Sequence, residues 1–509
     1  MLKDIQKQLL LKYPLLWNTK FVPMVVIGLA IHLIFFALGY LDGTIDFSGK
    51  IAFDLDVFSV MFGILLCLII IILWLVNYFK NNALKSFYSK SKEAVFYEWL
   101  QIFVICTLLI TFYIPFSFGK QWHQSSYYSL EETKRRCAVI SSADMFIDGS
   151  FAETEIDSVA SGLKTEIIDK VADSTPVNGF NEDYEYNGRV FKNHIVFDGK
   201  VYNRFSLLNR NNFHFSISTP KEDSIQKIKV QNWLHTNNQR AIKNLMSDYL
   251  TILREHRLKT NLTLEKWFEI TYKNPDFENF LYIKPYVDEY EATNRYDYRD
   301  QRFQPYTNYD TDKYSHYFVQ QNVLKEKYDI IADAHTNAYF NYEVLVFYLY
   351  SALGLSLFIF SFRVTSGKSW LIALVAIGVL NIVYGIFSAA SSSILTYLFF
   401  IFATIIGLSI YYLVIFTGKK TIQYSRIALN MLLWSFTYCI PIIYFFIIDS
   451  YRNKNYDYHY EESIYVRDPF YDWLNYHITD MFLINFFVTI LVLFFLTKTI
   501  RNWKGLAEE

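Results

Sequence analysis

Apolar residues are gathered into runs long enough to cross a lipid bilayer, and this feature restricts the fold more than any other. A transmembrane helix needs about 20 consecutive, mainly apolar residues. Eight runs of that length occur along the 509 residues, separated by markedly polar sequence. They lie at residues 21–41, 57–78, 98–118, 344–363, 369–389, 394–416, 427–448 and 478–497. The sequence therefore predicts an α-helical polytopic membrane protein with eight transmembrane helices.

Basic residues are distributed unevenly among the short segments between these runs. Cytoplasmic loops of membrane proteins carry an excess of Lys and Arg. On the side of the N-terminus the short segments hold Lys3, Lys7, Lys12, Lys20, Lys80, Lys85, Lys90, Lys92, Arg363, Lys368, Lys419, Lys420, Arg426, Lys498, Arg501 and Lys504. On the other side they hold only Lys50, Arg452, Lys454 and Arg467. We expect both termini in the cytoplasm and a multi-pass location in the cytoplasmic (inner) membrane.

A long polar block separates the third run from the fourth and, with this orientation, lies outside the cytoplasm. The predicted architecture is three helices, an extracytoplasmic (periplasmic) α+β domain, then five helices. The expected domains are a cytoplasmic amphipathic helix at 1–20, helices 1–3 at 21–118 with a cytoplasmic helical loop at 79–97, the extracytoplasmic domain at 119–342, helices 4–8 at 343–497, and a cytoplasmic tail at 498–509.

Within the polar block, Asp198-Gly199 joins two β-prone segments, residues 194–197 and 200–207. An Asp-Gly pair favours a type I′ turn, so a hairpin is expected here. Phe213, Phe215 and Ile217 alternate with polar residues, which predicts a third strand.

Helical patterns follow the hairpin. Apolar residues at helical spacing between Ile242 and Leu253 predict an amphipathic helix. From Tyr306 to Ala352 there is neither Pro nor Gly, which predicts a stalk helix that begins near Val319 and continues into the fourth span.

Composition excludes several classes of function. With 48 basic and 49 acidic residues there is no basic excess for nucleic-acid binding. Four cysteines, three of them in apolar runs, give neither a disulfide framework nor a thiolate metal cluster. Gly367-Lys368-Ser369 lacks the earlier glycine of a phosphate-binding loop, so we expect no ATPase activity and no cofactor in this chain.

The predicted spans have no Asp, Glu, Lys or Arg away from their ends, which argues against proton relays and voltage sensors. Their strongly polar side chains are His32, Asn381, Asn430 and Asn485. These residues either form hydrogen bonds between helices or line a substrate path. Pro441 predicts a kink in the seventh span.

Tyrosines are concentrated in the segments expected outside, nine between Tyr282 and Tyr317 and seven between Tyr451 and Tyr476. They suit either an interfacial aromatic belt or a surface that binds a glycan, an amphiphile or an extracytoplasmic protein.

Two cytoplasmic segments have helical patterns. Leu2 to Trp17 combines leucines with lysines and suits an interfacial helix. Phe79 to Tyr97 mixes basic and apolar residues without Gly or Pro and suits either a connector or a helix that docks a soluble partner. The docking alternative would use Lys80, Lys85, Phe87, Lys90 and Lys92.

With these two segments the sequence resembles the permease subunits of ABC-type exporters, which have an amphipathic helix before the first span and a coupling helix between the second and third. The opening segment Leu11-Lys12-Tyr13-Pro14-Leu15-Leu16-Trp17-Asn18 is also similar to permease-like membrane proteins of Gram-negative bacteria. The chain differs from the usual exporter subunit in its eight spans and in the large domain after the third. The resemblance implies a subunit of a transport complex, or a homodimer, that a separate cytoplasmic ATPase energises.

Three functions therefore stay open. The first is a permease-like subunit that handles an envelope component. The second is a membrane enzyme that acts on a lipid-linked substrate at the outer face, with Asp54 and Asp56 as acid/base groups. The third is a sensor or assembly protein with a partner-binding ectodomain. No catalytic motif is found, which favours a non-enzymatic role.

Overall fold

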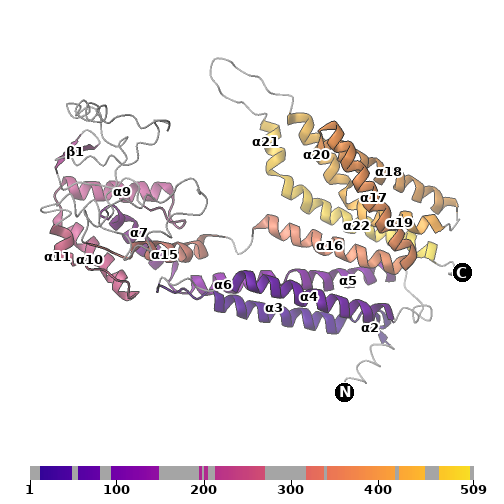
Figure 1. The fold of residues 1–509 in the computed structure, drawn as a ribbon, viewed down its shortest axis with the longest axis horizontal. Coiled ribbons are helices and arrows are strands. Elements are labelled where there is room, and N and C mark those ends of the chain that lie inside the picture. Colours follow the sequence, from indigo (N-terminus) through magenta and orange to yellow (C-terminus); the bar gives the residue numbers. More distant parts are fainter. Residues whose placement is uncertain are drawn as a thin grey trace, which may run out of the picture. The chain divides into compact units, whose positions relative to one another are not determined.

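A computed structural model of the chain describes ten ranges of residues, and all structural statements below refer to them. The ranges are 12–48, 55–80, 93–147, 194–197, 200–203, 213–269, 317–337, 341–418, 423–452 and 469–504. The chain divides into two compact units (Figure 1). Unit 1 comprises Met1–Asp42, Asp54–Gly119 and Ala338–Glu509, and unit 2 comprises Gly43–Phe53 and Lys120–Asn337. Each unit is described by itself.

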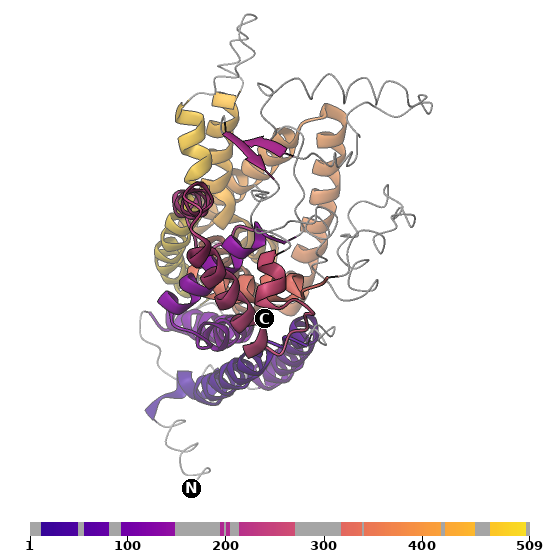
Figure 2. The same cartoon turned by 90° about the vertical axis from the view of Figure 1, so that its left-hand side faces the viewer.

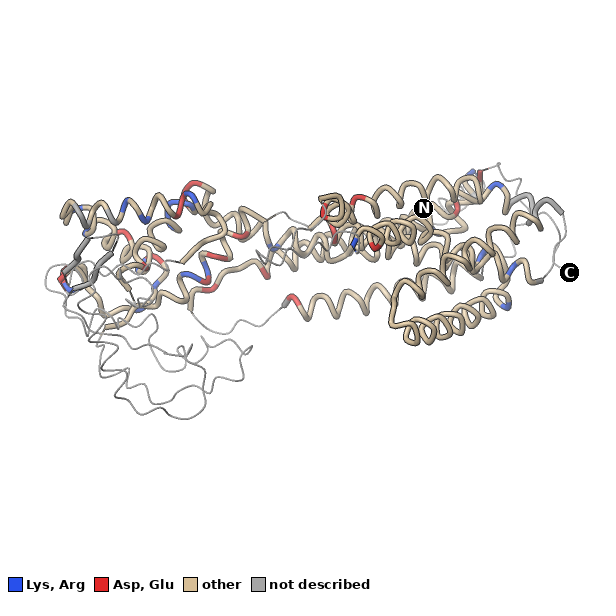
Figure 3. Tube along the Cα trace, turned by 90° about the horizontal axis from the view of Figure 1, so that it is seen from above, with Lys and Arg blue, Asp and Glu red and all other residues tan. Residues whose placement is uncertain are grey.

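Unit 1 consists of apolar helices. They are α2 (Pro14–Asn18), α3 (Phe21–Asp42), α4 (Leu55–Lys80), α5 (Ala94–Ile110), α6 (Tyr113–Ser125, which continues into unit 2), α16 (Tyr342–Val364), α17 (Gly367–Ser391), α18 (Ile394–Gly418), α19 (Gln423–Ser435), the 3-10 turn η6 (Phe436–Tyr438), α20 (Cys439–Arg452), α21 (Pro469–Tyr476) and α22 (Ile478–Lys504). Within the described ranges, seven helical segments are long and apolar enough to cross a membrane, and α5 with α6 would make an eighth as one bent span. Charged residues are sparse along these helices (Figure 3). The chain is a multi-pass helical membrane protein, as the sequence predicts.

The third predicted span, expected as one helix over 98–118, is broken. Helices α5 and α6 meet at an angle of 42°. Pro115 lacks the N–H that would bond to the Thr111 carbonyl four residues earlier, and its ring crowds that carbonyl. Instead, the Thr111 carbonyl accepts from the backbone N–H of Ile114 at 3.0 Å. The third predicted span is therefore not one straight helix; a single bent span stays a prediction, and Pro115 explains the bend.

The seventh predicted span is interrupted as Pro441 leads one to expect. Helix α19 ends at Ser435, η6 follows, and α20 begins at Cys439. Pro441 cannot donate to the carbonyl of Thr437, which lies four residues before it in η6. A neighbouring helix supplies the missing donor, as described below.

Helices α3 and α6 pack backbone against backbone. A Cβ added at Gly39 would lie 1.9 Å from the Phe116 carbonyl oxygen, and one added at Gly119 would lie 2.2 Å from the Phe36 carbonyl oxygen. Only glycine permits this approach from both sides, as small residues do in membrane helix pairs. Elsewhere in the unit α16 packs on α5, and α17 packs on both α18 and α19.

Unit 2 is mainly helical. Its helices are α7 (Leu130–Asp144), α9 (Pro220–His235), α10 (Gln239–Glu255), α11 (Leu264–Phe268) and α15 (Gln321–Thr336). The predicted amphipathic helix is confirmed as α10, and its apolar stripe is buried against α7, α9 and α11. Ile45 and Phe47, from the segment between α3 and α4, pack against the same core. The sequence treats that segment as a short outside loop, whereas it belongs to this unit.

The predicted hairpin is confirmed. Strands β1 (His194–Phe197) and β2 (Lys200–Asn203) pair antiparallel, with Phe197 opposite Lys200 (Figure 2). The predicted third strand is wrong, because residues 213–217 form no strand. Phe215 and Ile217 are nevertheless buried in the helical core, so their alternation reflects packing against helices. Among the described residues the α+β character rests on two four-residue strands.

The predicted continuous stalk is also wrong. Helix α15 ends at Thr336, and Asn337 adopts an extended backbone (ψ 139°). Helix α16 starts anew, because the Asn341 side chain caps it by accepting from the Glu343 N–H. The break between the two helices is therefore set by Asn337 and Asn341, in a stretch of sequence that has no Pro or Gly.

Candidate functional site

A partly open cavity of about 560 Å3 lies among the helices of unit 1, and Gly354 and Asn381 are exposed in its wall. Residues of α16, α17, α18, α19, η6 and α20 line it. Most of its wall is aliphatic or aromatic, including Leu353, Ile377 and Trp434. A volume of this size is within the range of roughly 300–1,000 Å3 that holds small ligands in proteins.

Two polar pairs from α17 and α18 interrupt the apolar wall. The Tyr397 hydroxyl donates to Asn381 Oδ1 at 2.6 Å, and Asn381 Nδ2 donates to the Ile377 carbonyl at 2.9 Å. The hydroxyls of Tyr384 and Thr404 are 2.5 Å apart. Hydroxyl oxygens keep lone pairs after donating, so these groups can still accept a bond from a ligand.

Asn485 connects three elements beside this cavity. Its Nδ2 atom, on α22, donates to the Thr437 carbonyl at 2.9 Å and to the Tyr350 hydroxyl of α16 at 2.6 Å. Because Pro441 has no N–H, it cannot donate to the Thr437 carbonyl, and Asn485 donates to that carbonyl instead. Tyr350 and Thr437 both line the cavity, and Asn485 thereby fixes part of its wall.

Of the four predicted path residues only Asn381 is among the described residues that line the cavity. His32 Nε2 donates to the Leu108 carbonyl at 2.8 Å, in the last turn of α5, where carbonyls lack an intrahelical donor. Asn430 is fully buried and accepts from Thr365 Oγ1 at 3.0 Å. The structure thus places Asn381 in the cavity wall, Asn485 behind two residues of that wall, and His32 at the break between α5 and α6. Their role in a substrate path stays a prediction.

A buried ion pair lies in unit 1 at the ends of two predicted spans. Arg363 Nε, on α16, donates to Glu98 Oε1 of α5 at 2.9 Å. The hydroxyl of Tyr78, on α4, donates to the same carboxylate oxygen at 2.7 Å. All three residues are buried, and the Arg363 guanidinium lies 5.0 Å from the centre of the Tyr78 ring. We call Tyr78, Glu98 and Arg363 the buried triad.

The buried triad flanks the predicted docking segment. Tyr78 precedes it and Glu98 follows it, so its two ends are bonded to each other, and Arg363 is bonded to Glu98. Of the predicted coupling residues, Lys80 ends α4, while Lys85, Phe87, Lys90 and Lys92 lie outside the described residues. Most of the predicted amphipathic helix at 1–20 lies outside them as well, and so do both tyrosine-rich segments except Tyr317, Tyr451, Tyr471 and Tyr476.

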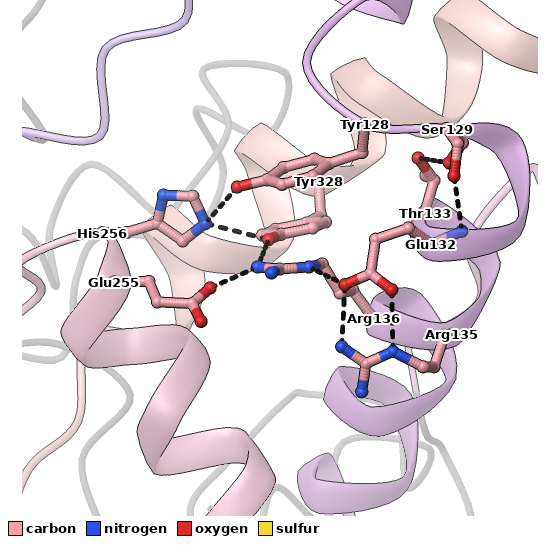
Figure 4. A network of polar contacts seen from close by, with 9 residues as sticks. All are labelled: Tyr128, Ser129, Glu132, Thr133, Arg135, Arg136, Glu255, His256 and Tyr328. Carbon is pink, nitrogen blue, oxygen red and sulfur yellow. Dashed lines mark hydrogen bonds and ion pairs between the residues drawn. The ribbon is translucent and has the colours of Figure 1, made fainter.

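Unit 2 contains a polar network centred on Arg136 of α7 (Figure 4). Its guanidinium donates to Glu132 Oε1 and to Glu255 Oε2, each at 2.6 Å, and to the Tyr328 hydroxyl at 3.0 Å. The Tyr328 hydroxyl also lies 2.8 Å from His256 Nε2. The network joins α7, the end of α10 and α15.

The titratable groups of this network are shifted from their ordinary values. Hydrogen bonds from Arg135 and Arg136 lower the pKa of Glu132 to about 2. Burial, together with the positive charge of Arg136, lowers the pKa of His256 to about 4. Burial raises the pKa of Tyr328. His256 is therefore neutral at neutral pH, and Phe47 stacks on its ring with centroids 3.8 Å apart. These contacts hold α7, α10 and α15 together.

Little in the described residues points to catalysis. Asp56 accepts from the Tyr113 hydroxyl at 2.8 Å, and its predicted companion Asp54 lies outside the described residues. No group of three or more His, Cys, Asp or Glu among the described residues could hold a metal ion.

Comparisons with protein-family models, with curated proteins and with solved structures find no match to this chain.

Sequence reasoning missed the buried triad and the Arg136 network because both depend on pairing across long stretches of chain. Glu98 and Arg363 stand at the ends of predicted spans, where charges are ordinary. The sequence offered one local sign of burial. Glu98 and Arg363 each lie at the border of an apolar run and not in the loop beyond it. The sequence contained no comparable signal for the contact of Phe47 with His256.

Proposed function

We propose that this chain is the permease-like membrane subunit of a transport or export complex, energised by a separate cytoplasmic ATPase, and that it handles an envelope component. In this proposal both termini are cytoplasmic, residues 119–342 form an extracytoplasmic α+β domain, and α5 with α6 is one of eight spans. The excess of basic residues on the side of the termini supports that orientation.

The observation that carries the proposal is the bonding of the two ends of the docking segment at Glu98, which accepts from Tyr78 and from Arg363 of α16. A partner that pulls or pushes residues 79–97 displaces Tyr78 and Glu98, which are bonded to each other, and Glu98 is also bonded to Arg363. A buried charge that loses its partner is costly, about 3–5 kcal/mol in measured cases, so the three residues move together.

Helix α16 carries that displacement toward the cavity. Arg363 lies near its C-terminal end, and Tyr350, Gly354 and Leu357 of the same helix line the cavity. A helix is rigid along its axis, so movement at Arg363 reaches the cavity wall, which begins at Phe358 of the same helix. This gives partner docking a physical route to a site where a substrate can bind.

The proposal is tested by extracting the complex gently from native membranes and weighing it by mass spectrometry. We expect a nucleotide-binding subunit in fixed stoichiometry and ATP hydrolysis by the purified complex. Glu98→Gln keeps the size of the side chain and removes its charge, so we expect the partner to bind while ATP hydrolysis falls at least threefold.

Glu343→Gln is the matched control, since it makes the same change at the exposed, opposite end of α16. It is expected to leave hydrolysis unchanged. Absence of any nucleotide-binding subunit from the complex refutes the permease function. Equal hydrolysis by the Glu98→Gln and wild-type complexes refutes the coupling through the buried triad.

One observation favours a second candidate, a sensor or assembly protein. The segment that connects α3 to α4 packs into unit 2, where Phe47 stacks on His256 and the Ile45 N–H donates to the Tyr127 hydroxyl at 2.9 Å. A partner bound to unit 2 could thereby act on the first two membrane helices through the chain itself. This candidate requires function to persist without any nucleotide-hydrolysing subunit, and to be lost in Phe47→Ala.

A further inference from the structure

The charge of the cavity wall restricts what can bind there. Among the described residues none with a formal charge lines the cavity. Transfer of an unpaired ion into such surroundings is expensive, and buried ions in proteins are paired or hydrogen-bonded by charged partners. A phosphate, carboxylate or ammonium group would find no counter-ion in this wall, so the wall selects an uncharged occupant.

The polar pairs in the wall indicate what the uncharged occupant presents. Tyr397 with Asn381, and Tyr384 with Thr404, offer hydroxyl oxygens as acceptors, while Thr404 itself donates to the Phe400 carbonyl at 2.8 Å. Ser435 and Tyr438 add two further hydroxyls to the wall. Such groups match a hydroxyl or carbonyl on the ligand and would hold it by ordinary hydrogen bonds.

The rest of the wall matches a hydrocarbon chain. Leu353, Leu357 and Ile401 contribute aliphatic surface, and Phe358 and Trp434 contribute aromatic surface with ring centroids 5.2 Å apart. The cavity volume of about 560 Å3 suits one chain with a small head better than a lipid with several chains.

We infer that this cavity binds a neutral single-chain amphiphile whose head bears hydroxyl or carbonyl groups. The inference names the substrate class of the proposed permease and rests on the proposed function only for the passage of that substrate. Binding itself requires no partner subunit.

Gly354 provides a precise way to fill the cavity. It lines the wall, and a Cβ added to it meets no atom within 4 Å, so the side chain in Gly354→Leu enters open space without disturbing helix packing. Gly385 of α17 is the matched control, because an added Cβ there also meets no atom within 4 Å and the residue is not among those that line the cavity.

The experiment uses the purified full chain in phosphatidylcholine nanodiscs and a photoactivatable, clickable monoacylglycerol as the probe. We expect crosslinks to map to the cavity-lining residues of α16, α17, α18 and α19. Gly354→Leu should reduce labelling at least fivefold, and Gly385→Leu should leave it unchanged. The same chain with a phosphate head, a photoactivatable lysophosphatidic acid, is expected to label the cavity at least fivefold less.

Three results overturn the inference. They are labelling that Gly354→Leu does not reduce, crosslinks that map evenly over the lipid-facing helices, and equal labelling by the phosphate-bearing probe. The outcome is separable from that of the proposed function. Labelling of the cavity in a chain that has no ATPase partner keeps the site and removes the permease function, whereas a stable ATPase complex without labelling keeps the permease function and removes the site.

Discussion

Asn485 is expected to stabilise unit 1 by donating a hydrogen bond to the Thr437 carbonyl, which receives no backbone donor from Pro441. The perturbation is Asn485→Leu, which keeps the approximate volume of the side chain and removes both of its donated bonds. Those bonds run to the Thr437 carbonyl at 2.9 Å and to the Tyr350 hydroxyl at 2.6 Å. Both cross from α22 to other elements, so their loss weakens contacts between helices.

The magnitude follows from measurements on other membrane proteins. Hydrogen bonds between transmembrane helices contribute about 0.6 kcal/mol on average and up to about 1.7 kcal/mol. Two such bonds predict that Asn485→Leu lowers the free energy of unfolding by about 1–3 kcal/mol. The upper part of this range applies if the Thr437 carbonyl, which Pro441 cannot serve, finds no other donor.

A double-mutant cycle isolates the contribution of the hydrogen bond from Asn485 to the Thr437 carbonyl. Pro441→Ala restores an N–H at position 441, which can bond to the Thr437 carbonyl as in an uninterrupted helix. In that background Asn485→Leu should cost less by about the value of one bond, roughly 0.6–1.7 kcal/mol. Tyr350→Phe is the control, because it removes the other partner of Asn485, and its cost should be the same in both backgrounds.

Equilibrium unfolding in mixed micelles of dodecyl maltoside and sodium dodecyl sulfate, followed by tryptophan fluorescence, measures each free energy. If Asn485→Leu costs the same with proline or alanine at position 441, the assignment of Asn485 as the replacement donor is refuted.

Three further predictions concern unit 2. In Phe47→Ala the loss of the stack on His256 should speed amide hydrogen exchange over residues 43–48 by about threefold to tenfold, since aromatic pairs contribute about 0.5–1.5 kcal/mol; unchanged exchange would contradict it. Arg136→Met should lower the free energy of unfolding of unit 2 by about 1–3 kcal/mol, less than for a fully buried pair because Glu132 and Glu255 are partly exposed; a thermal melt of the full chain that does not shift would argue against this role. Because the folded pKa of His256 is about 4, below the ordinary 6.5, its contribution to stability is present above about pH 6.5 and is lost as the pH falls from there toward 4. After discounting for its partial exposure the loss is about 1–2 kcal/mol, and His256→Gln should flatten the measured dependence of unfolding on pH in that window.

Hydropathy was sufficient to predict most of the membrane helices, because a bilayer imposes length and composition on every span. The errors all concern interruptions. Pro115 bends the third span because it has no N–H to donate to the carbonyl of Thr111, four residues earlier. Asn337 and Asn341 separate α15 from α16 although the sequence there has no Pro or Gly. Such breaks depend on local hydrogen bonds, which a search for apolar runs does not detect.

The candidate site was predictable only in its residue types. The sequence identified Asn381 and Asn485 as polar groups in apolar helices, yet the cavity that Asn381 lines is built from helices whose mutual packing is not encoded in hydropathy. In unit 2 the alternation of Phe213, Phe215 and Ile217 correctly indicated burial and wrongly indicated a strand. A period of two predicts which side chains face a core, and the neighbours decide the backbone conformation.

The polar residues of the membrane unit serve two distinct purposes. His32 and Asn485 each donate to a backbone carbonyl beside a helix break, at Leu108 and at Thr437. Since each donor belongs to a different helix from the carbonyl it serves, neither break can open or straighten without separating packed helices. Asn381, in contrast, bonds to Tyr397 on the cavity wall and repairs no break. Substitution of His32 or Asn485 should therefore lower stability first and ligand binding only in proportion, whereas Asn381→Leu should weaken binding with little change in the free energy of unfolding.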